Sequence, residues 1–388
     1  MKNFFSFLLV SLFLLPTMPA LVSCGDGQGG AETSNTDTNS TPDSTDGGVT
    51  TVPVEELLVD NVYNIAEAPR RFKLFGNRMV PMGNAVTCDF TASGIEFRGY
   101  MKGEIKLTLK CDRDTYFTVF INGERVSKRF LATPDTNQLV IADLEKAGEY
   151  SIRVLKQTEP QWSLAKLYCI SLCGTLYDAP ANDKYYVEFI GDSITCGYGN
   201  LGDSSSKDPG TAIWEDGTRA YAFLTAEALG ADANIVGCSG IGIDKAWTSF
   251  NEAAFYPANS YFRDKNKPLV NNARVPDLVV INLGTNDALR GSGKINFSRG
   301  VKELITTVRE FYGKDVPIVW AYGMMGKACA EWTLPVLEQM GGEAAGIYSC
   351  ELPANNKGAN GHPSLSAQKS ASTRLVNFIK SKNILPKD

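Results

Sequence analysis

The pattern of apolar residues changes near residue 180, and this change constrains the fold more than any other feature of the chain. Before it, residues 54–177 alternate over short stretches: Ile105, Leu107 and Leu109 would face one way while the residues between them face the other. After it, short apolar runs alternate with segments of helical periodicity. The sequence therefore predicts two different domains, one all-β and one α/β.

The first domain is predicted to be a β-sandwich, of jelly-roll type, because helical periodicity is nearly absent from it. Residues 116–121 and 124–130 flank Asn122-Gly123, a dipeptide that supplies the positive φ angles of a type I′ hairpin turn. The role expected of this domain is structural support or contact with carbohydrate. Further strands are expected over residues 94–100, 138–142 and 150–156.

In the second domain, the alternation of apolar runs with helical segments predicts a parallel sheet with helices on both faces. Apolar residues recur at three- and four-residue steps over residues 364–382, which indicates an amphipathic helix at the C-terminus. Active-site residues in such sheets lie at the carboxyl ends of the strands, so the residues that follow each strand are candidates for a site. Strands are expected over residues 185–190, 233–238, 277–283, 317–322 and 347–352, with helices over 219–229 and 297–312.

The first 53 residues indicate export. Residues 1–24 combine a short positive start, an apolar run too short to span a bilayer, and small residues before Cys24. This resembles a bacterial lipoprotein signal, which implies a membrane-anchored protein in the periplasm or on the cell surface; an ordinary secretory signal with Cys24 incidental is the alternative. Residues 25–53 predict a flexible tether rich in Ser, Thr, Gly and Asp. The β-sandwich is then expected over residues 54–178 and the α/β domain over 184–388.

Charge and cysteine content exclude several classes of function. A net charge of -5 with scattered Lys and Arg argues against a nucleic-acid partner. Zinc is disfavoured because the chain has no CxxC pair and only one histidine, and we expect no cofactor. Exported cysteines can oxidise, but connectivity does not follow from sequence. Cys196 and Cys238, near two adjacent strand ends, form either a disulfide or two buried thiols, and we favour thiols.

Three motifs fall at the predicted strand ends. The first strand breaks at GDS (191–193), the second ends in GCSG (237–240), and the third breaks at GTND (284–287). The single histidine, His362, comes before the last helix. A helix cap, a turn, an Asx turn and a surface histidine would explain each motif separately. A serine nucleophile, its base and fixed oxyanion donors explain all four together, because an unassisted serine hydroxyl reacts poorly near neutral pH.

In this order the motifs resemble the four blocks of SGNH (GDSL-type) hydrolases, which contribute a Ser, a Gly, an Asn and a His. The stretch GDSITCGYG (191–199), the turn at 239–242 and the preceding β-domain resemble carbohydrate esterase family 2 in particular, over essentially the whole chain after the tether. The resemblance implies a Ser193–His362 catalytic pair. It also implies an oxyanion hole made by the backbone N–H groups of Ser193 and Gly240 and the side chain of Asn286. The implied substrates are O-acetylated plant polysaccharides or oligosaccharides.

One position departs from the resemblance. Many SGNH hydrolases carry an Asp three residues before the His, and this chain has Ala359 there, with Asn360 next to it. Without that carboxylate another group must orient the imidazole. Members of carbohydrate esterase family 2 use a Ser-His dyad oriented by a backbone carbonyl. We therefore expect a main-chain carbonyl upstream of His362 to accept its Nδ1–H, with the Asn360 side chain as a second candidate.

Two tryptophans are candidates for lining a sugar cleft. Trp214 lies in the loop after Ser193, and Trp247 follows the Gly240 motif. Two other functions stay open: a hydrolase of the same type that acts on lipids or thioesters, and a carbohydrate-binding lipoprotein without catalysis, which the missing acid would permit. The Gly-, Ser- and Asp-rich loop after the serine argues against a long acyl pocket.

Overall fold

The computed structural model describes residues 57–76, 79, 81–207, 212–244, 274–327 and 329–385. These fall in one compact unit, Pro42–Asp388. The expected signal and tether, the lipidation candidate Cys24 and the cleft candidate Trp247 lie outside the described residues. Among the helices that the structure describes, none is both long and apolar enough to cross a bilayer.

The first part of the described chain folds into a ten-stranded sheet in which every paired strand runs antiparallel. Two long strands, β5 (Gly94–Cys111) and β9 (Gln138–Lys156), pair along most of their length. Each replaces two shorter strands expected from the sequence, because bulges near Gly103 let the pairing continue where the alternation breaks. The other strands are β1 (Asp60–Asn64), β2 (Lys73–Phe75), β3 (Pro81–Met82), β4 (Ala85–Cys88), β6 (Thr115–Ile121), β7 (Glu124–Arg125), β8 (Phe130–Ala132) and β10 (Ala165–Leu176).

The hairpin expected at Asn122-Gly123 is present between β6 and β7. Asn122 has φ 51° and Gly123 has φ 83°, so both central residues have the positive φ that a type I′ turn requires. The returning strand is shorter than expected, since β7 ends at Arg125 and the chain pairs with β6 again only as β8.

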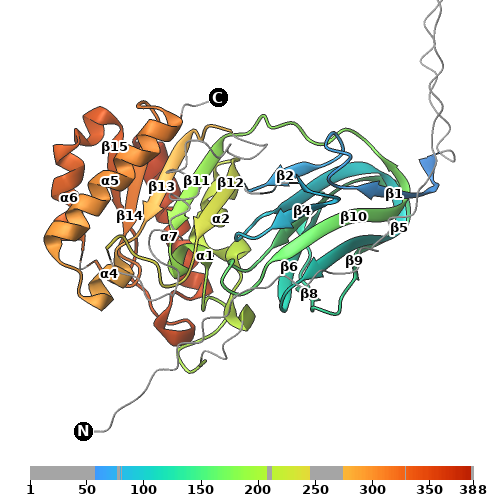
Figure 1. Ribbon diagram of the computed structural model, residues 1–388, viewed down its shortest axis with the longest axis horizontal. Helices are drawn as coiled ribbons and strands as arrows, with labels where there is room; N and C mark the ends of the chain where they lie inside the picture. Colours follow the sequence, from blue (N-terminus) through green and yellow to red (C-terminus); the bar gives the residue numbers. More distant parts are fainter. Residues whose placement is uncertain are drawn as a thin grey trace, which may run out of the picture. The chain divides into compact units, whose positions relative to one another are not determined.

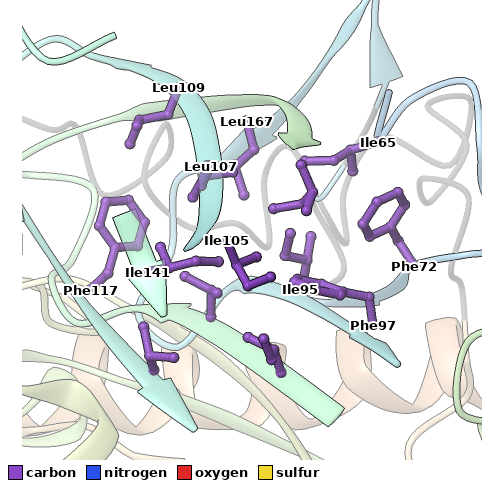
Figure 2. Close-up of a cluster of buried hydrophobic side chains, with 14 of the residues drawn as sticks. Ile65, Phe72, Ile95, Phe97, Ile105, Leu107, Leu109, Phe117, Ile141 and Leu167 are labelled. Carbon is purple, nitrogen blue, oxygen red and sulfur yellow. The ribbon is translucent and has the colours of Figure 1, made fainter. Parts of the chain in front are cut away.

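The interior of this antiparallel region is apolar. Ile95, Phe97, Ile105 and Leu107 lie along β5 and are fully buried, and they converge with side chains from neighbouring strands (Figure 2). Burial of one face of each strand is what the alternating pattern predicted. The all-β first domain is therefore confirmed.

The second part of the chain forms a five-stranded parallel sheet with strand order β12-β11-β13-β14-β15. All five strands lie where the sequence predicted them, within two residues at each end, and nearly all their residues are buried. Burial on both faces explains their continuous apolar character. The strands are β11 (Tyr186–Gly191), β12 (Asp232–Gly237), β13 (Leu278–Asn282), β14 (Ile318–Tyr322) and β15 (Ile347–Glu351).

Helices cover both faces of the parallel sheet (Figure 1). The buried residues of α2 (Tyr221–Ala228) and α7 (Leu365–Ser381) pack in one apolar cluster with one set of strand side chains. Those of α5 (Lys294–Tyr312) and α6 (Ala330–Gln339) pack in another cluster with the alternate set. Helix α6 was not expected, because Pro335 within it normally ends a helix.

The two sheets share one of these apolar clusters. Phe75 and Leu155 of the antiparallel sheet are buried in the same cluster as Phe189 of the parallel sheet. Phe120 and Phe223 meet across this boundary with ring centroids 6.1 Å apart. The boundary between the two folds is therefore continuous with the core of the α/β part.

Candidate active site

Ser193 lies in a tight turn at the carboxyl end of β11. The strand that follows β11 in sequence pairs on one side of it and the next strand pairs on the other, which makes this strand end a switch point of the kind where ligands bind in open α/β sheets. Asp192 accepts the Ile194 N–H at 3.0 Å and caps the short helix α1 (Ser193–Cys196). A β-carbon on Gly191 would lie 2.0 Å from a threonine hydroxyl oxygen, so the turn requires glycine there.

The turn after β12 carries Gly240. Its φ of 83° lies in the left-handed region that favours glycine. The chain beyond this turn is fastened by Asp287, whose carboxylate accepts the N–H groups of Ile243 at 2.8 Å and Asp244 at 2.7 Å. The turn is thereby linked to α4 (Thr285–Arg290), which follows the next strand of the sheet.

Asn286 is the second residue of α4. The chain leaves β13 and enters this helix through Gly284, whose φ is 118°. The Asn286 side-chain nitrogen donates to the Ile241 carbonyl at 2.7 Å and to Asp192 Oδ2 at 3.2 Å. These two bonds join the ends of three neighbouring strands at one place.

His362 reaches the nucleophile turn from a separate loop. Its Nε2 lies 2.9 Å from Ser193 Oγ. The loop lies against the turn after α1: the Ala359 N–H donates to the Gly199 carbonyl at 2.9 Å. A β-carbon on Gly199 would come within 2.6 Å of the Ala359 carbonyl oxygen and 2.9 Å of His362 Cβ. Glycine at 199 therefore lets the histidine loop approach the serine.

Tyr198 supports the imidazole from the side. Its ring meets the His362 ring edge to face, with centroids 4.7 Å apart and an interplanar angle of 77°. The Asn360 side-chain nitrogen donates to the Tyr198 hydroxyl at 3.1 Å. The contact found for the Asn360 amide is thus with the residue that packs on the imidazole. A main-chain acceptor for His362 Nδ1 stays a prediction.

These residues line one cavity of about 380 Å³. It contains Ser193, Gly240, Asn286, Asn360 and His362, so the structure brings five of the sequence-predicted site residues together. The remaining wall consists of Gln161, Trp162, Tyr198, Ser239, Thr285, Leu289 and Met325. Gln161 and Trp162 come from the segment between β9 and β10, in the antiparallel region. No motif pointed to them, because the loops of one domain carry no sequence signal for a contact with another.

Of the two tryptophans expected at the cleft, Trp214 is described by the structure, and it does not line the cavity. Its indole N–H donates to the Lys207 carbonyl at 3.0 Å. Trp162 lines the cavity instead, and its ring stacks on Tyr198 with centroids 5.9 Å apart and an interplanar angle of 14°. Among the described residues, the aromatic wall is therefore built by Trp162 and Tyr198.

The Asp192 carboxyl group, which bonds to Asn286, has a raised pKa. Asp192 is fully buried, and burial raises its pKa to about 7 against the hydrogen bond from Ile194, which lowers it. Near neutral pH this carboxyl is protonated for part of the time. In its protonated form Asp192 places no full negative charge beside Asn286.

Neither a metal site nor a disulfide appears in the part of the chain that the structure describes. Within the described ranges, no three His, Cys, Asp or Glu side chains converge as metal ligands would. Cys196 and Cys238 are buried free thiols, as favoured from the sequence, and burial raises the pKa of both.

Comparison with known proteins gives consistent matches. Residues 189–349 match the GDSL-like Lipase/Acylhydrolase family. The chain is 29% identical over 316 residues to the cellulase/esterase CelE of Acetivibrio thermocellus. The aligned region covers 77% of this chain and 38% of that protein. The chain is also 29% identical over 247 residues to an acetylxylan esterase / glucomannan deacetylase of Cellvibrio japonicus, covering 60% of this chain and 65% of that protein. The chain thus spans less than two thirds of the length of either relative.

A solved structure with similar architecture is that of a family two carbohydrate esterase from Clostridium thermocellum in complex with cellohexaose. It superposes with a TM-score of 0.72 at 27% identity and covers 81% of this chain and all of that chain. A match over this share of the chain takes in parts of both the antiparallel region and the parallel sheet. The chain carries a GDSL-type (SGNH) lipase/acylhydrolase domain within a two-domain architecture that matches the family 2 carbohydrate esterases.

Proposed function

We propose that the protein is a serine esterase that removes acetyl groups from plant polysaccharides or oligosaccharides. The observation that carries the proposal is the 2.9 Å contact between Ser193 Oγ and His362 Nε2 in a cavity that also presents Gly240 and Asn286. A nucleophile within hydrogen-bond reach of its base, beside fixed N–H donors, is the arrangement that acyl transfer requires.

In the proposed reaction, His362 takes the Ser193 proton while the oxygen attacks the acetyl carbonyl. The tetrahedral intermediate places its negative oxygen before the backbone N–H groups of Ser193 and Gly240 and the Asn286 side chain. The intermediate collapses as His362 returns the proton to the departing sugar oxygen. Water then attacks the acetyl-serine with His362 as base, which releases acetate and restores the serine.

To stabilise the intermediate, Asn286 must direct to the oxyanion a side-chain N–H group that already donates to a protein acceptor. Both of its N–H groups have protein partners, and the bond to Asp192 is the longer at 3.2 Å, against 2.7 Å to Ile241. The proton that points at Asp192 is therefore the one that we assign to the oxyanion. Losing a bond to a carboxyl with a pKa near 7 costs less than losing one to a full carboxylate.

A backbone carbonyl is the proposed orienter of the imidazole, because position 359 is alanine. Asn360 contributes through Tyr198: the amide holds the tyrosine hydroxyl, and the tyrosine ring holds the imidazole edge. Such an arrangement limits rotation of the imidazole ring without a carboxylate beside it.

The proposed substrate class draws on the cavity and on the relatives. The stacked pair Trp162 and Tyr198 offers aromatic surface next to the serine, and flat apolar faces of this kind suit sugar rings. The Cellvibrio japonicus relative is named an acetylxylan esterase / glucomannan deacetylase, and the Clostridium thermocellum structure holds cellohexaose. A β-linked, O-acetylated glycan is the substrate that these observations favour.

Release of acetate from acetylated xylan and acetylated glucomannan tests the proposal directly. We expect acetate from the unmodified protein, and a loss of about 10⁴-fold or more in Ser193→Ala. Faster turnover of long-chain acyl lipids or thioesters than of any acetylated sugar would contradict the proposed substrate. Oligosaccharide binding without any acetate release would identify a binding protein instead.

We also propose that Cys24 is lipidated and anchors the protein to a bacterial membrane, with residues 25–53 as tether. The proposal rests on the lipoprotein-like signal. We expect the protein in the membrane fraction of a producing cell, and the Cys24→Ser variant in the soluble exported fraction. Equal distribution of the two proteins would show that Cys24 is incidental.

A further inference from the structure

The antiparallel region sends one buried carboxyl group to the turn that carries the oxyanion donor Gly240. Glu159 lies between β9 and β10 and has no exposed surface. Its Oε2 accepts the backbone N–H of Ser239, the residue that immediately precedes Gly240. The contact joins residues 80 positions apart in the chain, of which one follows a strand of the antiparallel sheet and the other follows a strand of the parallel sheet.

Glu159 is itself held firmly in place. Its backbone N–H donates to Glu215 Oε1 at 2.7 Å. The Lys156 ammonium group, also fully buried, donates to the carbonyls of Asp89 at 2.9 Å and Thr158 at 2.6 Å. A bonded segment with so little freedom can transmit a fixed position to the group that it carries.

The same segment forms part of the cavity wall. Gln161 and Trp162, two and three residues after Glu159, line the cavity, and the Cys238 thiol donates to Gln161 Oε1 at 3.6 Å. The turn 238–240 is therefore contacted on one side by residues 159–162 and linked on the other to α4 through its neighbours. An oxyanion donor aligned in this way needs no reorganisation when charge develops.

We propose that Glu159 is a positioning residue for the oxyanion hole: by accepting the Ser239 N–H it fixes the peptide that presents Gly240 to the substrate. The antiparallel region thereby completes the catalytic apparatus. This inference rests on the proposed esterase function. Glu159 touches no reacting atom and acts only through the Ser239 N–H that it accepts. Burial raises the pKa of its carboxyl group, against the bonds from Ser239, which lower it.

The test compares three substitutions at position 159 with one elsewhere. Glu159→Ala removes the acceptor, Glu159→Asp withdraws it by one methylene, and Glu159→Gln keeps an oxygen of the same reach. Glu188→Gln is the matched control, because Glu188 is equally buried but accepts bonds from Asn234 of β12 and Tyr312 of α5, away from the turn at 238–240. The full chain without its signal is used throughout, and thermal unfolding is recorded for each variant.

Two readouts are taken on each variant. The first is kcat and KM for a small activated acetyl ester, with Ser193→Ala as the blank. We expect Glu159→Ala and Glu159→Asp to lower kcat by about 10- to 100-fold with KM changed less than about threefold, because misplacing a donor by a fraction of an ångström acts in the transition state. Glu159→Gln should retain kcat within about fivefold, and Glu188→Gln should match the unmodified protein.

The second readout is hydrogen exchange of the backbone amides in a peptide covering residues 236–243, which needs no turnover. Faster exchange in Glu159→Ala and Glu159→Asp, but not in Glu159→Gln or Glu188→Gln, supports the proposed brace, which is the contact between the Glu159 carboxyl group and the Ser239 N–H. Unchanged exchange overturns it, and so does faster exchange with an unchanged kcat. If Glu159→Ala does not fold, Glu159→Asp carries the comparison. Absence of turnover in the unmodified protein overturns the esterase proposal and the catalytic role of the brace together, while the exchange data still show whether the contact exists.

Discussion

The two sheets contribute to the cavity in different ways. The parallel sheet supplies the proposed reacting groups, each on a short turn directly after a strand or before the last helix. The antiparallel sheet supplies no reacting group, but one inter-strand segment that carries Glu159, Gln161 and Trp162 to the same place. The first contribution follows from the topology of the sheet and has a sequence signature. The second depends on how two domains meet, and it has none.

The largest effect is expected for the imidazole, which belongs to the parallel-sheet side. His362→Ala removes the proposed base, which is the single histidine of the sequence, and should lower kcat by about 10⁴-fold or more on any acetyl ester. The measurement is steady-state hydrolysis with Ser193→Ala as the reference. Substantial residual activity above that reference would show that another group deprotonates the serine.

The second effect concerns the oxyanion donor on α4. Asn286→Ala should lower kcat by about 10²- to 10³-fold with little change in KM, because the side chain is assigned to the transition state. Asn286→Asp is a useful companion, since it places a second carboxyl next to Asp192 and should be worse at high pH than at low pH. A loss confined to KM would instead make Asn286 a substrate-binding residue.

The third effect tests the antiparallel side through its tryptophan. Trp162→Ala should raise KM for acetylated oligosaccharide by about 10-fold while kcat for a small acetyl ester changes less, because the ring offers a surface for the sugar and holds no reacting atom. Trp214→Ala is the matched control, since it removes the same side chain from outside the cavity lining. Equal effects of the two substitutions would remove the distinction between them.

The fourth effect is on stability and concerns the core of the parallel sheet. Burial raises the pKa of Glu188 from 4.5 to about 7, so the folded protein holds a proton there that the unfolded chain releases at lower pH. The contribution of Glu188 to the free energy of unfolding is complete below about pH 4.5. It falls by on the order of 3 kcal/mol as the pH rises to about 7. Chemical denaturation across this range should show the decline, and Glu188→Gln should reduce its slope.

The smallest effect is expected beside the histidine. Asn360→Asp should change kcat by no more than about threefold, because the amide contacts Tyr198 and a main-chain carbonyl is the proposed orienter. The pH profile of kcat/KM is the measurement. A large rate gain would show that the native dyad lacks an orienting group and that a carboxylate at this position supplies it.

Much of the architecture could be predicted from the sequence, because parallel strands and alternating strands leave distinct patterns. The strands of the parallel sheet lie where continuous apolar runs place them, and the Asn122-Gly123 turn followed from its dipeptide. The exceptions have local causes. Bulges merged expected pairs of strands into β5 and β9, and Pro335 concealed α6, since proline within ten residues normally argues against a helix.

The site divides in the same way. Ser193, Gly240, Asn286 and His362 share one cavity, as their positions at strand ends and before the last helix led us to expect. Trp214 was placed at the cleft because it is near Ser193 in sequence, but sequence distance says little about which face of a long loop turns inward. Contacts such as that of Glu159 with Ser239 depend on how the two sheets pack against each other, which no periodicity encodes.

The apolar cluster shared by the two sheets bears on how the molecule comes apart. Phe75, Phe120 and Leu155 of one fold are interleaved with Phe189 and Phe223 of the other, so neither half can melt without exposing part of its neighbour's interior. Calorimetry should record a single cooperative transition. Truncating the protein to its α/β half would expose the apolar surface that the antiparallel sheet covers. A smaller protein could be made from that half only after this surface had been redesigned to be polar.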